Sequence, residues 1–288
     1  MLKPVRTLFT LTMLYLLSVC SIASAQLPVP DVPIIVLDSV ADAVFRVDPA
    51  TGDRTVVSNA ATGTGPNFDQ PVDITVGPNG ELYVIDTGGI QADAVFRVDP
   101  ANGDRTIISQ TGTVGTGDPG TDLWNPTGVT VNPDGRIFVS DNGGGPGPAD
   151  LILEIDPANG NRSILSDDSG QGSGPNFGSV IDITYDVTRN MVVVAGPSGV
   201  FRVDPTTGDR QVVSDASTGT GTPFSSVFGP SGVETSPDDG SIIILDIEAE
   251  PPDFINQFYL VFSVNPISGN RQELSGESFG SGTPFNSP

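Results

Sequence analysis

Carboxylates and hydroxyls are the main groups that this 288-residue sequence offers for chemistry. It has no histidine, and its only lysine and only cysteine are Lys3 and Cys20, both within the first 25 residues. The usual pairs of a nucleophile and a base therefore cannot form in the remainder of the chain. Catalysis there would use Asp or Glu as acid and base, or a metal ion held by oxygen ligands.

Asp73 and Asp182 are the most specific candidates for a site, because two other repeats hold Gly128 and Gly232 at the corresponding positions. Each aspartate is expected at the start of an innermost strand, near the mouth of a central channel. Two carboxylates around one axis would attract a cation or a polyhydroxylated ligand. The alternatives are carboxylates that water solvates or that pair with arginines.

A second group of aspartates ends the expected second strand of each repeat: Asp38, Asp86, Asp141 and Asp246. Calcium takes oxygen ligands of this kind, so Asp86 and Asp141 join Asp73 and Asp182 as predicted calcium ligands. No other cofactor is indicated. The competing interpretation, which we favour, is that each strand-end aspartate bonds the backbone of its own loop.

Trp124, the only tryptophan, lies with Asn125 in the segment TDLWNPTG. This segment is expected to be a loop on the same rim, and both residues are candidate ligand-binding residues. An exposed indole could stack on a sugar or anchor a partner, whereas a packed indole would cover a junction between repeats.

These candidates belong to a chain built from one recurring hairpin. The copies return about every fifty residues: VFRVDPATGDR from Val44, VFRVDPANGDR from Val95, ILEIDPANGNR from Ile152, VFRVDPTTGDR from Val200 and VFSVNPISGNR from Val261. Each copy reads as a strand, a turn with Asp or Asn, Pro and Gly, and a second strand. The repeated arginines are expected to be structural and to bond the neighbouring aspartates of their hairpins.

Two further β-rich runs separate successive hairpins, for example PVDITVGPNGELYVID at 71–86 and PTGVTVNPDGRIFVSD at 126–141. Four antiparallel strands per repeat predict an all-β fold, a β-propeller of four-stranded antiparallel blades with five recognisable repeats. Before the first hairpin, only QLPVP is available as the first strand. Two alternatives therefore stay open: five blades that close with a poor seam, or a six-bladed ring truncated at its C-terminus.

The first 25 residues are typical of a cleaved secretory signal, because Lys3 and Arg6 precede an uncharged apolar run that ends in Ala23-Ser24-Ala25. We expect residues 1–25 to be a signal peptide and residues 26–288 to form a single propeller domain. The location would be extracytoplasmic, either secreted or periplasmic, with no stable membrane insertion after cleavage. The net charge of −23 disfavours nucleic acid as a partner.

The blade pattern, seen in PDGRIFVSD and in VFRVDPATG, resembles the consensus of NHL-repeat proteins and of the regucalcin and gluconolactonase family. That resemblance covers most of residues 34–285 and implies propeller architecture. It also implies a divalent metal held at the channel by carboxylate and amide ligands, among them a glutamate near the start of the chain. The first glutamate here is Glu81. Streptogramin lyases look similar as well, but their catalysis needs a histidine.

Together these features predict an exported, acidic β-propeller that acts as a non-catalytic binding or interaction module for a protein or carbohydrate ligand. The alternative is a calcium-dependent hydrolase or lactonase of the regucalcin type that uses the channel carboxylates. A third hypothesis is a structural repeat module at the cell surface. The sequence leaves enzymatic activity open and favours its absence.

Overall fold

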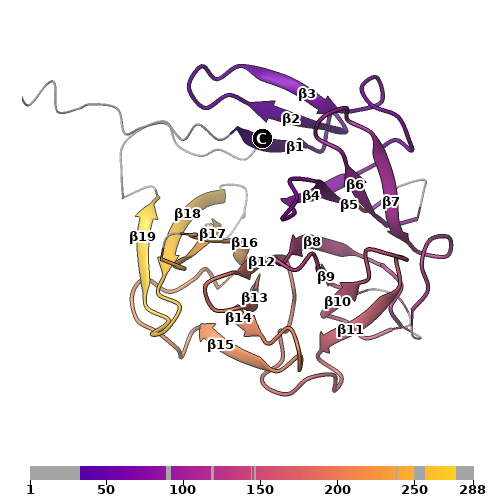
Figure 1. Ribbon diagram of the computed structural model, residues 1–288. Coiled ribbons are helices and arrows are strands. Elements are labelled where there is room, and N and C mark those ends of the chain that lie inside the picture. The colour runs from indigo at the N-terminus through magenta and orange to yellow at the C-terminus, as the bar shows by residue number, and fades with distance from the viewer. Residues whose placement is uncertain are drawn as a thin grey trace, which may run out of the picture. The chain divides into compact units, whose positions relative to one another are not determined.

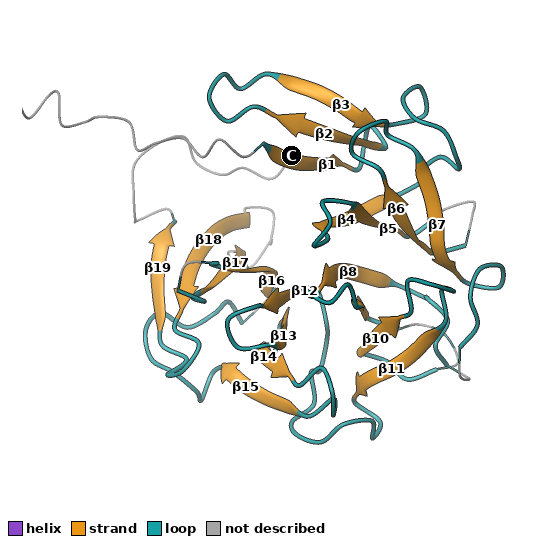
Figure 2. Cartoon of the chain, viewed as in Figure 1, coloured by secondary structure: helices purple, strands orange, loops and turns teal. Residues whose placement is uncertain are grey.

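The computed structural model describes residues 33–88, 92–117, 120–143, 145, 147–226, 228–237, 239–249 and 257–276. The predicted signal peptide and the segment QLPVP lie outside the described residues. All regular elements in the described part are β-strands (Figure 2). Within that part, no helix is long and apolar enough to cross a membrane.

The strands form five antiparallel sheets in chain order (Figure 1). The first sheet contains β1 (Ile34–Asp38), β2 (Ala43–Val47) and β3 (Arg54–Ser58); the second contains β4 (Pro71–Val76), β5 (Leu82–Asp86), β6 (Ala94–Val98) and β7 (Arg105–Gln110); the third contains β8 (Pro126–Val131), β9 (Ile137–Asp141), β10 (Leu151–Ile155) and β11 (Arg162–Asp167); the fourth contains β12 (Asp182–Asp186), β13 (Met191–Gly196), β14 (Gly199–Val203) and β15 (Arg210–Ser214); the fifth contains β16 (Gly229–Thr235), β17 (Ile242–Ala249), β18 (Gln257–Val264) and β19 (Arg271–Ser275).

The protein is an all-β propeller with five blades, as the repeats predict, although the first blade has three described strands where four were expected. The chain divides into two compact units. The smaller one holds residues 46–55 together with the described residues up to Ile35, and the larger one holds 36–45 and everything from Val56 on. A single domain over 26–288 stays a prediction.

Within the larger unit, the first strands of successive blades lie next to each other: β4 beside β8, β8 beside β12 and β12 beside β16 (Figure 1). The later strands of each blade lie progressively farther from this inner edge. The loops that lead into the innermost strands therefore share one rim with the loops between the second and third strands of the blades, for example between β5 and β6. This rim is called here the loop rim. The turns within each outer hairpin share the opposite rim.

The aspartate and the glycine that recur in the hairpin have physical reasons, which the second blade illustrates. The Asp99 carboxylate accepts a hydrogen bond from the Ala101 amide at 2.8 Å, and Gly103 N donates to Asp99 O at 2.8 Å. Gly103 has a φ of 80°, where a side chain would be strained. A Cβ at this position would also collide with the Val57 carbonyl of the preceding blade. The glycine thus serves both the turn and the close approach of two blades.

The arginine that ends the motif clamps its blade to the preceding one. In the fourth blade, Arg210 Nη1 donates to Ser166 Oγ at 2.7 Å, and Ser166 Oγ donates to Gly208 O at 2.8 Å. Arg210 Nε donates to Pro175 O at 2.8 Å, and its guanidinium lies over the Phe177 ring, 5.2 Å from the centroid. We call this set of contacts the arginine clamp. It joins a buried guanidinium to the last strand and the following loop of the neighbouring blade.

The clamp occurs at four successive junctions: Arg105 with Ser58, Arg162 with Ser109, Arg210 with Ser166, and Arg271 with Ser214. These four arginines are buried. The expectation that the arginines are structural is therefore confirmed, but the expected partners were wrong. Among the described ion pairs, Arg162 is the one of the four that pairs with a carboxylate, that of Asp122, at 3.1 Å. The other hydrogen bonds of these arginines go to serine hydroxyls and carbonyl oxygens. These acceptors lie on the preceding blade and the loop that follows it, whereas the expected aspartates lie on the arginine's own hairpin.

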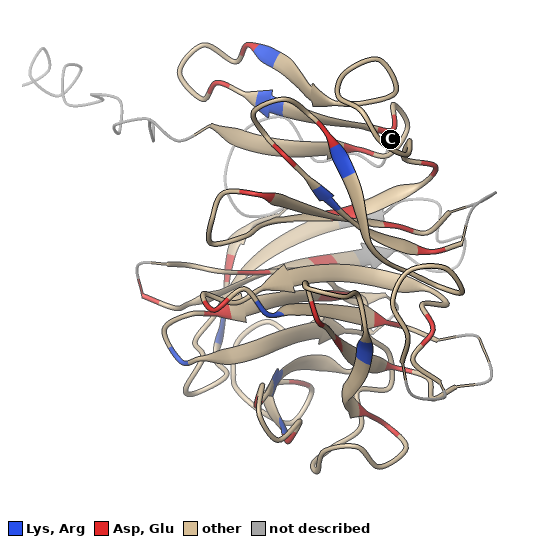
Figure 3. Ribbon diagram, turned by 45° about the vertical axis from the view of Figure 1, so that its right-hand side comes forward, with Lys and Arg blue, Asp and Glu red and all other residues tan. Residues whose placement is uncertain are grey.

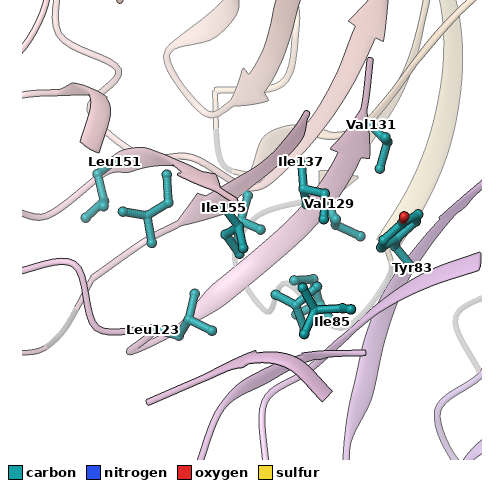
Figure 4. Close-up of a cluster of buried hydrophobic side chains, with 12 residues drawn as sticks. Tyr83, Ile85, Leu123, Val129, Val131, Ile137, Leu151 and Ile155 are labelled. Carbon is teal, nitrogen blue, oxygen red and sulfur yellow. The ribbon is translucent and has the colours of Figure 1, made fainter. Parts of the chain in front are cut away.

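Apolar contact between blades completes the junctions. The cluster between the second and third blades includes Ile85 and Val95 from one side and Ile137 and Leu153 from the other, each fully buried (Figure 4). Burying a side chain of this size contributes about 1.5–3 kcal/mol. The blades therefore hold the inner strands and the loop rim in fixed positions.

Candidate functional site

The structure places Asp73 and Asp182 at the inner edge of the larger unit, as predicted. Asp73 lies on β4, and Asp182 begins β12, with β8 between these two strands. A Cβ at Gly128 of β8 would lie 2.8 Å from Asp182 Oδ1. The glycine therefore leaves the space that the carboxylate occupies, which gives a steric reason for glycine at position 128.

Each of these carboxylates bonds the innermost strand of the next blade. Asp73 Oδ2 accepts a hydrogen bond from Val129 N at 2.7 Å, and Asp182 Oδ2 accepts one from Val233 N at 2.7 Å. Asp182 Oδ1 also accepts from Ile183 N at 2.8 Å. The two aspartates thus have a structural role that sequence reasoning did not identify. Neither is paired with an arginine among the described ion pairs.

Glu234 on β16 completes an inner group of three carboxylates, and the sequence analysis missed it. Its Oε1 accepts a hydrogen bond from Thr184 Oγ1 at 2.9 Å. The signal that could have found it is positional: the corresponding residues of the other blades are Thr75, Thr130 and Thr184. A charged residue in a set of threonines indicates a specialised position.

Burial, followed by repulsion from neighbouring carboxylates, favours the protonated forms of Asp73 and Asp182. Burial, followed by the negative charges of Asp73 and Glu234, raises the pKa of Asp182 to about 8. Burial also raises the pKa of Asp73, and the charge of Glu234 adds to the effect. Both side chains keep some contact with solvent. Asp182 can therefore exchange a proton near neutral pH.

The Asp73→Asn variant is expected to lower the pKa of Asp182, since it removes one of the two neighbouring negative charges. A carbon-13 NMR titration of the Asp182 carboxyl measures this directly. In the wild type, the raised folded-state pKa favours the protonated native state. This contribution is fully present below about pH 4 and is lost as pH rises through about 8. The exposed Asp99→Asn is the control; an unchanged Asp182 pKa in Asp73→Asn would refute the coupling.

Asp86 and Asp141 end β5 and β9 and bond the backbone of the loops that lead into their own blades. Asp141 accepts from Trp124 N at 2.9 Å, Asn125 N at 3.2 Å and Gly143 N at 2.7 Å. Asp86 repeats the arrangement with the amides of residues 69, 70 and 88. The favoured interpretation, in which strand-end aspartates bond loop backbone, is therefore confirmed. The buried carboxylates of Asp86 and Asp141 hold these loops in place.

Among the described residues, no group of three or more His, Cys, Asp or Glu side chains is arranged to hold a metal ion. Asp73 and Asp182 interact at the inner edge, whereas Asp86 and Asp141 bond separate loops. The four predicted ligands therefore do not form one cluster. The calcium assignment itself stays a prediction.

Asp93 lies near both strand-end aspartates on the loop rim. Burial, followed by the negative charges of Asp141 and Asp86, raises its pKa to about 7. On the same rim, burial and the charges of Asp86, Asp69 and Asp38 raise the pKa of Asp42. The rim therefore carries closely spaced carboxylates that repel one another. Figure 3 shows acidic residues in the loops of successive blades.

Trp124 projects from this acidic rim and is 44% exposed. Its backbone is held by the buried Asp141 carboxylate, and Gly145 lies so close to the indole that a Cβ there would collide with it. Its neighbour Leu123 is buried in the core between blades, 2% exposed. The indole thus packs against Gly145 of its own blade, and a large part of it faces solvent, so the expected packing over a junction between repeats is not what these contacts show. Asn125 contributes its backbone amide to the Asp141 network.

Comparison with known proteins supports the architecture. The NHL repeat family matches residues 123–145, which span the Trp124 loop, β8 and β9. The fold is that of the NHL-like and regucalcin-like β-propellers. A search of curated proteins found no match.

Three solved structures illustrate the likeness. The nidogen/laminin complex aligns with a TM-score of 0.59 and 16% identity, over 86% of this chain and 76% of that one. A gluconolactonase from Xanthomonas campestris gives 0.53 and 16%, over 74% and 65%. The calcium-binding protein regucalcin from Agrobacterium tumefaciens gives 0.50 and 18%, over 78% and 68%. At such identities the likeness concerns the fold alone.

Proposed function

We propose that this protein is an exported, non-catalytic binding module whose loop rim binds a partner protein through Trp124 and the surrounding carboxylates. The observation that carries the proposal is the fixed yet exposed indole. Asp141 bonds the backbone of its loop, and the ring still presents 44% of its surface to solvent. An aromatic side chain held in this way loses little entropy on binding and is a typical interface anchor.

The charges of the rim indicate the chemistry of the partner. Asp93 and Asp42 have pKa values raised in part by other aspartates, so their negative charges are mutually unfavourable. The described ion pairs involve other acidic residues. A segment rich in Lys and Arg would relieve this repulsion, and one of its cations could stack on Trp124. A cationic protein segment is therefore the best-matched ligand.

The similar structures agree with a binding role without assigning one. The matched chain of the nidogen/laminin complex has a similar fold, and that structure is an assembly of two proteins. The assembly is a property of those proteins. It supports the present proposal because loops on a rigid propeller scaffold are suited to partner recognition.

Binding of a labelled hexa-arginine peptide, followed by fluorescence anisotropy, tests the proposal. We expect Trp124→Ala to weaken the affinity about tenfold, because it removes a central aromatic anchor. The control is Ile267→Ala, which removes a side chain that is 83% exposed on a hairpin turn of the opposite rim. Added salt should weaken binding of the wild type.

Equal affinities of the wild type and Trp124→Ala would contradict a role for the indole. Saturable binding of a neutral oligosaccharide, in the absence of peptide binding, would replace the cationic partner with a carbohydrate ligand.

A second candidate function is the calcium-dependent hydrolase or lactonase, and the raised pKa values of Asp73 and Asp182 favour it. The two side chains would supply two of the six to eight oxygen ligands that calcium takes. This donor set does not by itself fit a complete calcium site. A calcium-dependent rise in melting temperature that is lost in the Asp73→Asn, Asp182→Asn double variant would favour this function.

Export is part of the proposal, since it rests on the signal-like segment at residues 1–25. Determining the N-terminal residue of the secreted protein checks it, with Gln26 as the expected first residue.

A further inference from the structure

Arg202 on β14 is a half-buried arginine with incomplete hydrogen bonding. Within the described part of the chain, its buried Nε has no hydrogen-bond partner. No described ion pair includes Arg202. Burial lowers its pKa, and the positive charge of Arg189 adds to the effect. Among the described residues, the guanidinium therefore forms no ion pair, although the negative charge of the nearby Asp186 acts on it.

The corresponding positions of two other blades contain a counterion. In the second blade, Arg97 lies opposite Tyr83, and Glu81, two residues before Tyr83, approaches Arg97 Nε to 3.7 Å. In the third blade the charges are exchanged, and Arg136 contacts Glu154 at 2.7 Å.

In the fourth blade, Arg202 lies opposite Val193, so the corresponding counterion position is Met191. Methionine carries no charge. The second and third blades therefore each contain an arginine and a glutamate at these two positions, whereas the fourth blade contains the arginine alone. In the fourth blade, the uncharged Met191 stands where the second blade has the Glu81 carboxylate.

The remaining charges near Arg202 do not compensate for this. Arg189 is held in place because its Nη1 donates to Asp186 Oδ2 at 2.9 Å and to Gly240 O at 3.1 Å. Asp186 is buried, 1% exposed, and its Oδ1 accepts the Arg189 amide at 3.0 Å. Both oxygens of this carboxylate thus bond Arg189. Two guanidinium groups share one acidic side chain in a protein of net charge −23.

We propose that Arg202 and Arg189 form a binding site for a small carboxylate ligand beside the turn between β12 and β13. Guanidinium groups bind carboxylates through paired, charge-assisted hydrogen bonds. The ligand occupies the role that Glu81 has toward Arg97 in the second blade. The site lies at the opposite end of the innermost strands from the Trp124 loop and does not depend on the function proposed for that loop.

Melting temperatures in succinate, against sodium chloride of equal ionic strength, test the proposal. We expect saturating succinate to raise the melting temperature of the wild type by about 2–4 °C, because a ligand that binds only the native state stabilises it. Arg202→Gln should lose the rise. The matched control Arg97→Gln, which alters the arginine that already has its counterion, should keep it.

A gain-of-charge variant strengthens the test. Met191→Glu places a carboxylate where the second blade has Glu81, so it should raise the melting temperature without ligand and abolish the response to succinate. No response of the wild type, an equal response of Arg202→Gln, or a response to phosphate without one to succinate would each overturn the proposal.

Discussion

Replacing Arg210 with alanine is expected to lower the free energy of unfolding by about 3–5 kcal/mol, because the buried guanidinium joins two blades. The substitution removes the bonds to Ser166 Oγ and Pro175 O and the contact over the Phe177 ring. It leaves a serine hydroxyl and backbone carbonyls in the interior with fewer partners. Urea unfolding measures the loss.

Arg54 provides the matched control for this substitution. It occupies the same position of the first repeat, but its side chain is exposed. A Cβ added at Gly52, two residues before Arg54, would meet no described atom within 4 Å, so no described blade approaches this turn closely. A Cβ at the corresponding Gly208 would collide with Leu165 O of the preceding blade. Arg54→Ala should change the free energy of unfolding by less than about 0.5 kcal/mol. Equal effects of the two substitutions would show that the clamp does not stabilise the blade junction.

The contrast between these two arginines shows what the sequence could predict. Repetition with alternating apolar residues predicts the strands, the turns and the blades, since each is encoded locally. The acceptors of Arg210 lie 35 to 44 residues earlier in the chain. Contacts of that range depend on how blades pack together, which a single repeat does not encode.

The candidate site follows the same division. The position of Asp73 and Asp182 in the repeat correctly predicted that both lie at the inner edge. The hydrogen bonds of Asp141 to its loop were also predictable, because aspartate at a strand end commonly accepts bonds from nearby backbone amides. The bonds from Val129 and Val233 to the inner aspartates were not predictable, because they join strands of different blades. The exposed fraction of Trp124 depends on how Gly145 and the loop rim are arranged around it.

The second large effect is expected for Asp141→Ala, which should lower the free energy of unfolding by about 2–4 kcal/mol. The buried carboxylate accepts hydrogen bonds from the Trp124, Asn125 and Gly143 amides. Removing it leaves three amides without that acceptor. The loop should lose its fixed position, so affinity for the hexa-arginine peptide should fall together with stability.

The comparison variant is Asp38→Ala, at the same position of the first repeat. Asp38 bonds the amides of Val40 and Ala41 in an exposed loop, so its loss should cost about 1 kcal/mol or less. A melting curve of Asp141→Ala that matches that of Asp38→Ala would indicate that the buried network does not hold the Trp124 loop.

The central claim is that the acidic rim binds a cationic partner through Trp124, and the emission of this single tryptophan tests it most directly. Titration of the wild-type protein with hexa-arginine is expected to change the intensity of the emission saturably, and Trp124 should be the only indole that contributes. High salt should reverse the change. Emission that stays constant through the titration, while the labelled peptide still binds, would place the binding surface elsewhere and contradict the proposal.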